Sequence, residues 1–300
     1  MRIAITGGTG FVGKALKDEL LRCGHTVFIL TRNKKQSNHQ NLFYVQWLNE
    51  GDHPANEMRE IDVFINLAGE SINSGRWTEE RKKRIVSSRI QATEEVLDII
   101  HKLQKKPDTL INASAIGFYG TSTSTVFTES NNEAGSDFLA TTVEKWEEKA
   151  AEAKKEEIRT VFCRFGIILD KNEGALPRMV LPYKLFAGGT VGSGEQWVSW
   201  IHLEDVVSAI LFALRNKDLI GPVNFTAPQP VRMKEFGEIL GSVLHRPHWI
   251  PAPSFALKLL LGEMSDLVLK GQKVLPNKLI DSGYSFKYAN LRNALSDIYS

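Results

Sequence analysis

The sequence contains little cysteine, and the absence of a cysteine framework excludes several kinds of protein. Its 300 residues include only Cys23 and Cys163, which provide neither a disulfide framework nor the spacing of a zinc site. A chain of this size without disulfide or metal cross-links is typical of a reducing cytosol, so we expect a cytoplasmic protein. The residues around Cys163 are apolar, and this predicts a core thiol rather than a nucleophile.

The sequence also lacks a strong excess of one charge. Its formal net charge is +2, which gives no sign of a nucleic-acid-binding surface. Segments 78–84 and 144–159 are dense in charge, but both mix the two signs at helical spacing, as a solvated helix face does. We therefore expect no nucleic-acid partner.

Long uncharged apolar runs are missing as well. The start, MRIAITGGTG, has no basic region followed by an extended apolar stretch, so it predicts a strand rather than a signal peptide. The most apolar segment elsewhere, 255–274, is interrupted by Lys258, Glu263, Asp266 and Lys270. We expect no membrane partner, and we expect an amphipathic helix packed on the carboxy-terminal part.

Short apolar, β-branched runs alternate along the chain with stretches of helical periodicity. This alternation predicts an α/β fold with a Rossmann-type, doubly wound parallel sheet that carries helices on both faces. The strands are expected at 2–6, 27–31, 63–68, 109–114, 160–165 and 223–226. The main helices are expected at 12–23, 79–102 and 141–155.

A glycine-rich loop joins the first expected strand to the first helix. The strand RIAIT runs directly into Gly7, Gly8, Gly10 and Gly13. In a βαβ unit these glycines permit a tight turn, a close approach of the backbone to a pyrophosphate and close packing of helix on strand. The amide groups at the helix N-terminus then face the anion. The alternative is an ordinary glycine turn without a ligand.

A second interpretation of the same loop is a nucleoside-triphosphate P-loop. The segment from Gly8 to Lys14 reads G-x-x-x-x-G-K. The next residue is Ala15, where a P-loop needs a Ser or Thr hydroxyl for magnesium. We therefore expect Lys14 to be a surface helix residue.

The end of the second strand predicts which nicotinamide cofactor binds. NAD requires an acidic residue there, whereas NADP requires a cation for its 2′-phosphate. Thr31 and Arg32 end the strand, and Lys34 and Lys35 follow. Arg32 can hold the phosphate through its planar fork, so we expect NADP(H). The alternative for Arg32 is a solvent-facing loop position.

Five motifs resemble those of the extended short-chain dehydrogenases/reductases. They are TGGTGFVG at 6–13, NLAGE at 66–70, SAIGFYG at 114–120, RFGIIL at 164–169 and WIHLEDV at 200–206. Longer blocks, including RWTEERKKRIVSSRI, GSGEQWVSWIH and LLLGEMSDLVLKGQKVLP, are similar to an atypical subgroup called the epimerase family. That subgroup has a distinctive, DUF1731-like carboxy-terminal domain.

The resemblance implies two domains with the active cleft between them. The NADP-binding Rossmann domain would comprise 1–165, with 198–226 returning to it, and a smaller mixed α/β substrate domain would comprise 166–197 and 227–300. The cofactor contacts implied by the loop and the resemblance are Thr6, Gly7, Gly8, Thr9, Gly10, Phe11, Val12, Gly13, Thr31, Arg32, Leu67, Ala68, Gly69, Ser114 and Arg164.

The catalytic pair of the wider superfamily is missing. Those enzymes use a Tyr and a Lys four residues later, because the cation and the cofactor ribose lower the pKa of the phenol. Here the Tyr position holds Leu139 or Ala140, and the Lys position holds Val143 or Glu144. The positions of two further active-site residues, a Ser and an Asn, hold Ala115, which is adjacent to Ser114, and Arg89.

Other residues must therefore carry any chemistry. Glu70 follows the expected strand at 63–68 and Tyr119 follows the one at 109–114, so both lie outside the carboxyl ends of the sheet, where ligands bind in such folds. We expect proton transfer from Tyr119 first and Glu70 second. The alternatives are that Tyr119 is a packing residue and that Glu70 pairs with a neighbouring arginine.

Several basic, aromatic and polar residues are candidates for substrate contacts. They are Arg76, Trp77, Lys82, Arg89, Gln196, Trp200 and His202. A single histidine before an acidic segment also fits a structural hydrogen-bonding role, which is the alternative for His202. His245 and His248 have no carboxylate or thiol companions at ligand spacing, so no metal site is expected.

These residues lead to two expectations about function. The first is an NADP-dependent oxidoreductase or epimerase acting on a sugar-nucleotide-like or other small polar substrate, as the resemblance implies. The second is a catalytically silent NADP(H)-binding sensor, which the missing Tyr-Lys pair favours. The sequence leaves the substrate, the reaction direction and the oligomeric state open.

Overall fold

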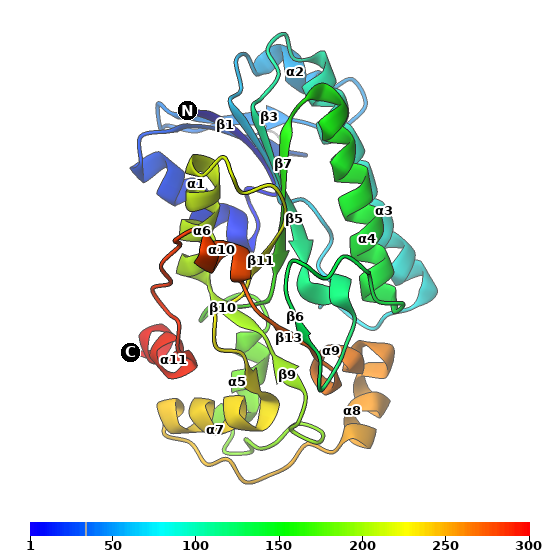
Figure 1. Cartoon of the computed structure of the whole chain (residues 1–300), viewed down its shortest axis with the longest axis vertical. Coiled ribbons are helices and arrows are strands. Elements are labelled where there is room, and N and C mark those ends of the chain that lie inside the picture. Colours follow the sequence, from blue (N-terminus) through cyan, green and yellow to red (C-terminus); the bar gives the residue numbers. More distant parts are fainter. Residues whose placement is uncertain (34) are drawn as a thin grey trace.

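Seven parallel strands form the central sheet of a computed structural model that describes residues 1–33 and 35–300 (Figure 1). Their order is β11-β7-β5-β4-β1-β2-β3, so the chain reverses direction across the sheet between β1 and β4. The bounds are β1 (Arg2–Thr6), β2 (Thr26–Thr31), β3 (Leu42–Gln46), β4 (Val63–Asn66), β5 (Thr109–Ala115), β7 (Arg159–Phe165) and β11 (Gly221–Phe225). All six predicted strands are confirmed. Lys34, expected near the cofactor, lies outside the described residues.

Helices cover both faces of this sheet, as predicted for a doubly wound Rossmann fold. On one face, α1 (Phe11–Arg22) and α6 (Leu203–Arg215) bury apolar side chains such as Leu16 and Ile210 against β1 and β2. On the other face, α3 (Glu79–Lys102) does the same with Val96 and Ile99, next to the short α2 (Pro54–Glu57). Cys163 lies fully buried within β7, which confirms it as a core residue.

The observed bounds of α3 and α4 can be compared with the predicted helices at 79–102 and 141–155. Helix α3 has the predicted bounds, and the Thr78 side chain accepts from the Arg81 backbone N–H at its start. Helix α4 (Phe138–Ala151) begins three residues before the predicted start because Asp137 caps it, and a 3-10 segment, η2 (Glu152–Glu156), follows.

A smaller mixed unit with its own apolar core lies at the carboxyl ends of the strands (Figure 1). Its core side chains come mainly from α5 (Leu176–Lys184), α7 (Met233–Leu244) and α11 (Leu291–Tyr299). The remaining short elements are η1 (Ile116–Tyr119), β6 (Val126–Phe127), β8 (Ile167–Leu169), β9 (Trp197–Val198), β10 (Trp200–His202), β12 (Val231–Arg232), β13 (Lys273–Val274) and α10 (Asn277–Asp281).

The expectation of one packed helix over 255–274 is wrong. The segment forms α8 (Ser254–Leu261), the 3-10 turn η3 (Gly262–Ser265), α9 (Asp266–Leu269) and then strand β13. Gly262 ends α8 with a φ of +61°, a conformation that favours glycine. Helix α8 buries none of its side chains, and Leu259 is 81% exposed.

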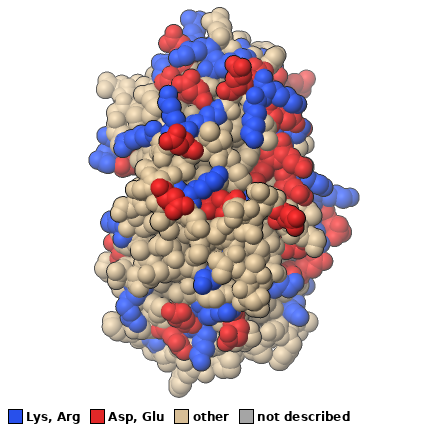
Figure 2. Space-filling view, in the orientation of Figure 1, with Lys and Arg blue, Asp and Glu red and all other residues tan. Residues whose placement is uncertain are grey.

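Charged side chains of both signs are interspersed on the surface shown in Figure 2, and a broad area of its lower half carries few of them. Within the described part of the chain, no helix combines the length and the apolar character needed to cross a membrane.

Candidate functional site

The loop after β1 is packed so tightly that only glycine fits at two of its positions. Gly7 has a φ of +66°, and a Cβ there would lie 2.5 Å from the carbonyl oxygen of Leu67. A Cβ on Gly13 would lie 2.2 Å from the carbonyl oxygen of Gly7. The end of β4, the loop and the first turn of α1 are therefore in direct backbone contact at the point where the strand order reverses.

The N-terminus of α1 is left open to an anion. Its cap is Gly10, which has no side chain to bond the first amides, and the exposed Thr9 precedes it. Because the first turn of a helix has no internal acceptors, the N–H groups of Phe11, Val12 and Gly13 are available to a ligand.

Lys14 does not point into this loop. Its side chain is more than half exposed, and its Nζ forms an ion pair with Glu173 at 3.0 Å. This confirms Lys14 as a surface helix residue, and it disfavours the P-loop interpretation, in which the lysine binds phosphate.

An exposed arginine follows β2, where the cofactor's adenosine half would lie in a Rossmann fold. The backbone of Arg32 is held by Asn49, whose Nδ2 donates to the Arg32 carbonyl at 3.1 Å, and Thr31 before it is buried. Among the ion pairs between described residues, none involves Arg32. Its guanidinium is therefore available to a phosphate.

A buried polar network holds the ends of β1, β4 and β5 in register. Asn66 accepts from the Thr6 hydroxyl at 2.6 Å and donates to Asn112 Oδ1 at 2.7 Å and to Thr93 Oγ1 at 3.1 Å. Its Oδ1 also accepts from the backbone N–H of Ala68 at 3.3 Å. The network fixes the half-buried backbone that runs through Leu67 and Ala68 to the exposed Gly69, and sequence reasoning missed it.

Ser114 and Arg164, both expected at the cofactor, are bound to a carboxylate that the sequence analysis did not single out. Arg164 donates from Nε and Nη2 to the two oxygens of Glu147 at 2.8 and 2.7 Å, and Ser114 Oγ donates to the same carboxylate at 2.5 Å. All three residues are buried. This cluster ties β5, β7 and α4 together and engages the Ser114 hydroxyl and two of the three guanidinium nitrogens of Arg164. The third, Nη1, is buried and has no hydrogen-bond partner among the described residues.

The positions of the missing Tyr-Lys pair present an apolar surface. Ala140 and Val143 are buried, and a Cβ on Gly117 would lie 3.4 Å from Leu139 Cβ. The start of α4 therefore packs on η1 and offers no acid or base there.

Tyr119 is buried in an aromatic cluster. Its hydroxyl donates to Asn224 Oδ1 at 2.8 Å, and its ring stacks on Phe127 at 5.2 Å between centroids. Burial raises the pKa of the Tyr119 phenol, an effect that the nearby Arg164 opposes. These contacts match the packing role that was the alternative for Tyr119.

Glu70 lies at the rim of the sheet, after β4, and is partly exposed. Its carboxylate forms an ion pair with the buried Arg81 and lies 4.0 Å from the Nε of Arg84. Its backbone N–H donates to Ser88 Oγ at 3.1 Å. Glu70 therefore has the arginine partner that the sequence left as an alternative, but it keeps access to solvent.

Arg76 and Lys82, expected at the substrate, instead join the two units. Arg76 donates to the carbonyl oxygens of Leu260 and Leu259 at the end of α8, at 3.0 and 2.9 Å. Lys82 forms ion pairs with Glu79 and with Glu263 of η3.

Trp77 is held nearby. Its Nε1 donates to the Ile72 carbonyl at 2.9 Å, and its ring meets Phe138 edge-on.

Trp200 and His202 also have structural contacts. Trp200 is fully buried, and its Nε1 donates to the Gln229 carbonyl at 3.1 Å. His202 accepts at Nδ1 from the Glu204 backbone N–H at 3.1 Å and caps α6, and its ring packs on Tyr288. Burial lowers the pKa of His202. Neither side chain is exposed to a substrate.

Gln196 lines a cavity of about 370 Å³ between the two units. Its Nε2 donates to the carbonyls of Val191 and Val268, at 3.0 and 2.8 Å. The rest of the lining is mostly small hydroxyl side chains with one cation: Thr121, Ser122, Thr123, Ser193, Leu269, Lys270 and Gly271. Lys270 pairs with Asp266 at 2.8 Å, so the cavity is polar but not strongly charged.

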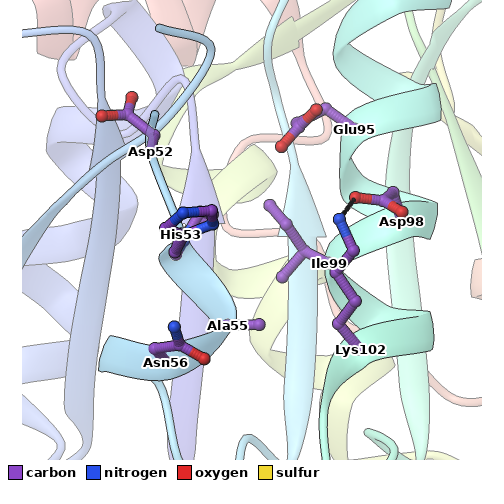
Figure 3. A pocket seen from close by; sticks show the side chains of 9 residues that line it. Asp52, His53, Ala55, Asn56, Glu95, Asp98, Ile99 and Lys102 are labelled. Atoms are coloured by element: carbon purple, nitrogen blue, oxygen red, sulfur yellow. Dashed lines mark hydrogen bonds and ion pairs between the residues drawn. The ribbon is translucent and has the colours of Figure 1, made fainter. Parts of the chain in front are cut away.

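A second cavity of about 300 Å³ lies between α2 and the end of α3 (Figure 3). In Figure 3, His53 and Asn56 come from the α2 side, and Glu95, Asp98 and Lys102 line α3 opposite them. Because α2 leads into β4 and α3 leads into β5, this cavity lies at the amino ends of the strands, away from the glycine loop. Among residues 1–33 and 35–300, no group of three metal-ligating side chains was found.

Comparison with known proteins gives full-length matches. The model of the NAD dependent epimerase/dehydratase family matches residues 3–225, and that of a domain of unknown function, DUF1731, matches residues 252–298. Epimerase family protein YfhF of Bacillus subtilis is 52% identical over 298 residues, which are 99% of this chain and 98% of that protein. An epimerase family protein of Staphylococcus epidermidis is 44% identical over 297 residues, or 99% and 98%.

Solved structures agree with these matches. The crystal structure of human epimerase family protein SDR39U1 with NADPH has a TM-score of 0.89 at 30% identity and covers 99% of each chain. UDP-glucuronic acid 4-epimerase from Bacillus cereus, at 17% identity and a TM-score of 0.80, shares the fold over 100% of this chain and 98% of that one. These matches confirm the resemblance that the motifs indicated.

Proposed function

Because the chain belongs to the NAD dependent epimerase/dehydratase family, we propose that it is an NADP(H)-dependent oxidoreductase or epimerase. The observation that carries this proposal is the open N-terminus of α1 above a glycine loop that no side chain can enter. That arrangement fits a pyrophosphate. The NADPH in the human relative's crystal structure supports the same cofactor.

Arg32 is the residue that would select the phosphorylated cofactor. It lies at the end of β2 and has no ion-pair partner in the described part of the chain. A guanidinium binds a 2′-phosphate bidentately, whereas NAD would require a carboxylate at this place. The bound nicotinamide would supply reversible hydride transfer.

Proton transfer is assigned to Glu70 rather than to Tyr119. The Tyr119 hydroxyl is buried and donates to Asn224, whereas Glu70 keeps solvent access at the carboxyl end of β4. Arg81 and Arg84 orient the Glu70 carboxylate. A base at this rim can reach a ligand that lies outside the strand ends.

The substrate is proposed to be small and polar. The cavity lined by Gln196 has a volume of about 370 Å³, near the lower end of the range for ligand pockets. Its hydroxyl-rich wall suits a compound with several hydroxyl or carbonyl groups.

Cofactor titration tests the proposal. Arg32→Ala is expected to weaken NADPH binding by about tenfold or more and to change NADH binding little, because only NADPH carries the 2′-phosphate. Arg59→Ala, which removes an exposed arginine before β4, at the amino ends of the strands and away from the glycine loop, is the matched control. Equal losses for both cofactors would refute the role of Arg32. A wild-type protein that binds neither cofactor would refute the proposed function.

The second candidate is a catalytically silent NADP(H) sensor. It is favoured by the apolar side chains at the Tyr-Lys positions and by the mutual pairing of Ser114, Glu147 and Arg164. Bound NADPH whose absorbance decays on addition of carbonyl compounds would support the enzyme. Cofactor that raises the melting temperature but is never oxidised would support the sensor.

A further inference from the structure

One cation in the crevice has no carboxylate to neutralise it. Arg89, on the third turn of α3, lies across Gly69, so that a Cβ on Gly69 would lie 3.3 Å from Arg89 Cγ and 3.4 Å from its Cζ. Gly69 follows β4, on the nicotinamide side of the point where the strand order reverses. The guanidinium is therefore placed at the mouth of the cofactor crevice.

Two of the three nitrogens of this guanidinium are free. Nη1 donates to the carbonyls of Ile85 and Glu70, at 2.9 and 3.1 Å. Within residues 1–33 and 35–300, Nε and Nη2 of Arg89 make no hydrogen bond. Both groups can therefore donate to a ligand.

The surroundings hold this cation rigidly and leave it charged. The guanidinium lies over the Trp146 ring, 5.1 Å from its centroid. Burial lowers the pKa of Arg89 to about 10, so it remains protonated at neutral pH, and Glu70 opposes the shift. The Glu70 carboxylate itself is engaged by Arg81.

Arg89 packs on α4, the helix on which the lysine of the usual Tyr-Lys pair is missing. Here α4 carries Val143 or Glu144 at that position, and Trp146, which supports Arg89, lies one turn along the same helix.

We propose that Arg89 replaces the missing lysine, donating to the ribose hydroxyls of the nicotinamide half of NADP(H) and placing a fixed positive charge beside the ring. The inference rests on the proposed function, because it requires that the crevice binds this cofactor. It assigns Arg89 to the cofactor, whereas the sequence analysis placed it at the substrate.

The positive charge of Arg89 would affect the binding of NADP⁺ and NADPH differently. The oxidised nicotinamide ring is positively charged and the reduced ring is neutral, so a neighbouring guanidinium disfavours NADP⁺ relative to NADPH. We expect Arg89→Gln to lower the ratio of the NADP⁺ dissociation constant to the NADPH dissociation constant by about tenfold, and Arg89→Lys to keep most of that ratio.

Calorimetric or fluorescence titration of each protein with NADPH and NADP⁺ gives these ratios. Lys83→Gln, which removes one exposed positive charge from the same helix, is the control and should leave the ratio unchanged. A ratio that stays at the wild-type value in Arg89→Gln, or that falls as far in Arg89→Lys as in Arg89→Gln, would overturn the assignment. Wild-type protein that binds neither form would refute the proposed function instead.

Discussion

Polar side chains at the carboxyl ends of the strands differ most in whether another side chain already binds them. Ser114, Glu147 and Arg164 bind one another and are buried, so their role is to join β5, β7 and α4. Arg32 forms no ion pair with a described residue, and Nε and Nη2 of Arg89 make no hydrogen bond within residues 1–33 and 35–300. At the residue scale, we therefore propose that these donors belong to the ligand site and that the bonded side chains support it.

Tyr119 belongs to the frame, and its substitution by Phe should reveal this. Removal of the hydroxyl leaves the buried Asn224 Oδ1 without a donor, so Tyr119→Phe is expected to lower the free energy of unfolding by about 1–2 kcal/mol. NADPH binding and any turnover should be retained. Denaturant unfolding and cofactor titration measure the two effects, with Tyr44→Phe on the edge strand β3 as the control. Loss of turnover without loss of stability would restore Tyr119 as the proton-transfer residue.

The sequence predicted the geometry of the glycine loop better than the side-chain contacts around it. The Gly7–Gly13 loop follows from local requirements, since a positive φ and close backbone contacts demand glycine. Glu147 was missed because it lies in a charge-dense helix whose pattern indicates a solvated face. Glu148, the next residue, is exposed there, and only the packing of α4 on β7 distinguishes the two.

At the scale of elements, β1, the glycine loop and α1 form one tightly packed unit. Its geometry depends on Gly13, because any side chain there would collide with the backbone of Gly7 and Gly8. Such a collision cannot be relieved by a rotamer change, so the first turn of α1 would have to move away from the loop.

Gly13→Ala is therefore expected to weaken NADPH binding by at least about tenfold, because a shift of the α1 amides removes aligned donors from the pyrophosphate. Lys14→Ala, at the next position, is expected to leave binding unchanged, since Lys14 pairs with Glu173 at the surface. Titration of both variants with NADPH and with ATP measures this. Loss of binding in Lys14→Ala would favour the P-loop interpretation.

Buried elements of the sheet were predictable, and exposed elements were not. The predicted strands β1, β4 and β5 are buried along nearly their whole length because helices cover both faces. Strand β3 was missed because it lies at the edge of the sheet, where only two of its five residues are buried. The prediction of a packed helix over 255–274 was wrong because the apolar side chains of α8 are exposed rather than buried.

At the scale of the whole molecule, the two units are joined by contacts far apart in sequence. Strand β13 pairs with β6, and Arg76 and Lys82 reach α8 and η3. A further contact is made by Glu129, whose Oε1 accepts from the backbone N–H groups of Asn224 in β11 and Lys278 in α10, at 2.9 and 3.3 Å. Its Oε2 is buried and has no hydrogen-bond partner in the part of the chain that the structure describes.

This buried carboxylate should make the stability of the whole chain depend on pH. Burial raises the pKa of Glu129 above its ordinary value of 4.5. Its contribution to stability is fully present below that value and is lost as the pH rises through the pKa of the folded state, because only the unfolded chain ionises freely. Each unit by which folding raises the pKa is worth about 1.4 kcal/mol.

Glu129→Gln removes this ionisation and can keep an oxygen acceptor for both N–H groups. The variant is therefore expected to gain stability relative to the wild type as the pH rises from about 4.5 to about 7.5. Urea unfolding across that range measures the difference, and Glu133→Gln, an exposed glutamate in the same loop, should show no such trend. If the difference between Glu129→Gln and the wild type stayed constant over the range, Glu129 would be titrating as it does in the unfolded chain. That result would require the buried contact of Glu129 with β11 and α10 to accommodate a charge without cost. The Glu129 Oε2 atom, which is buried and has no hydrogen-bond partner among the described residues, argues against this.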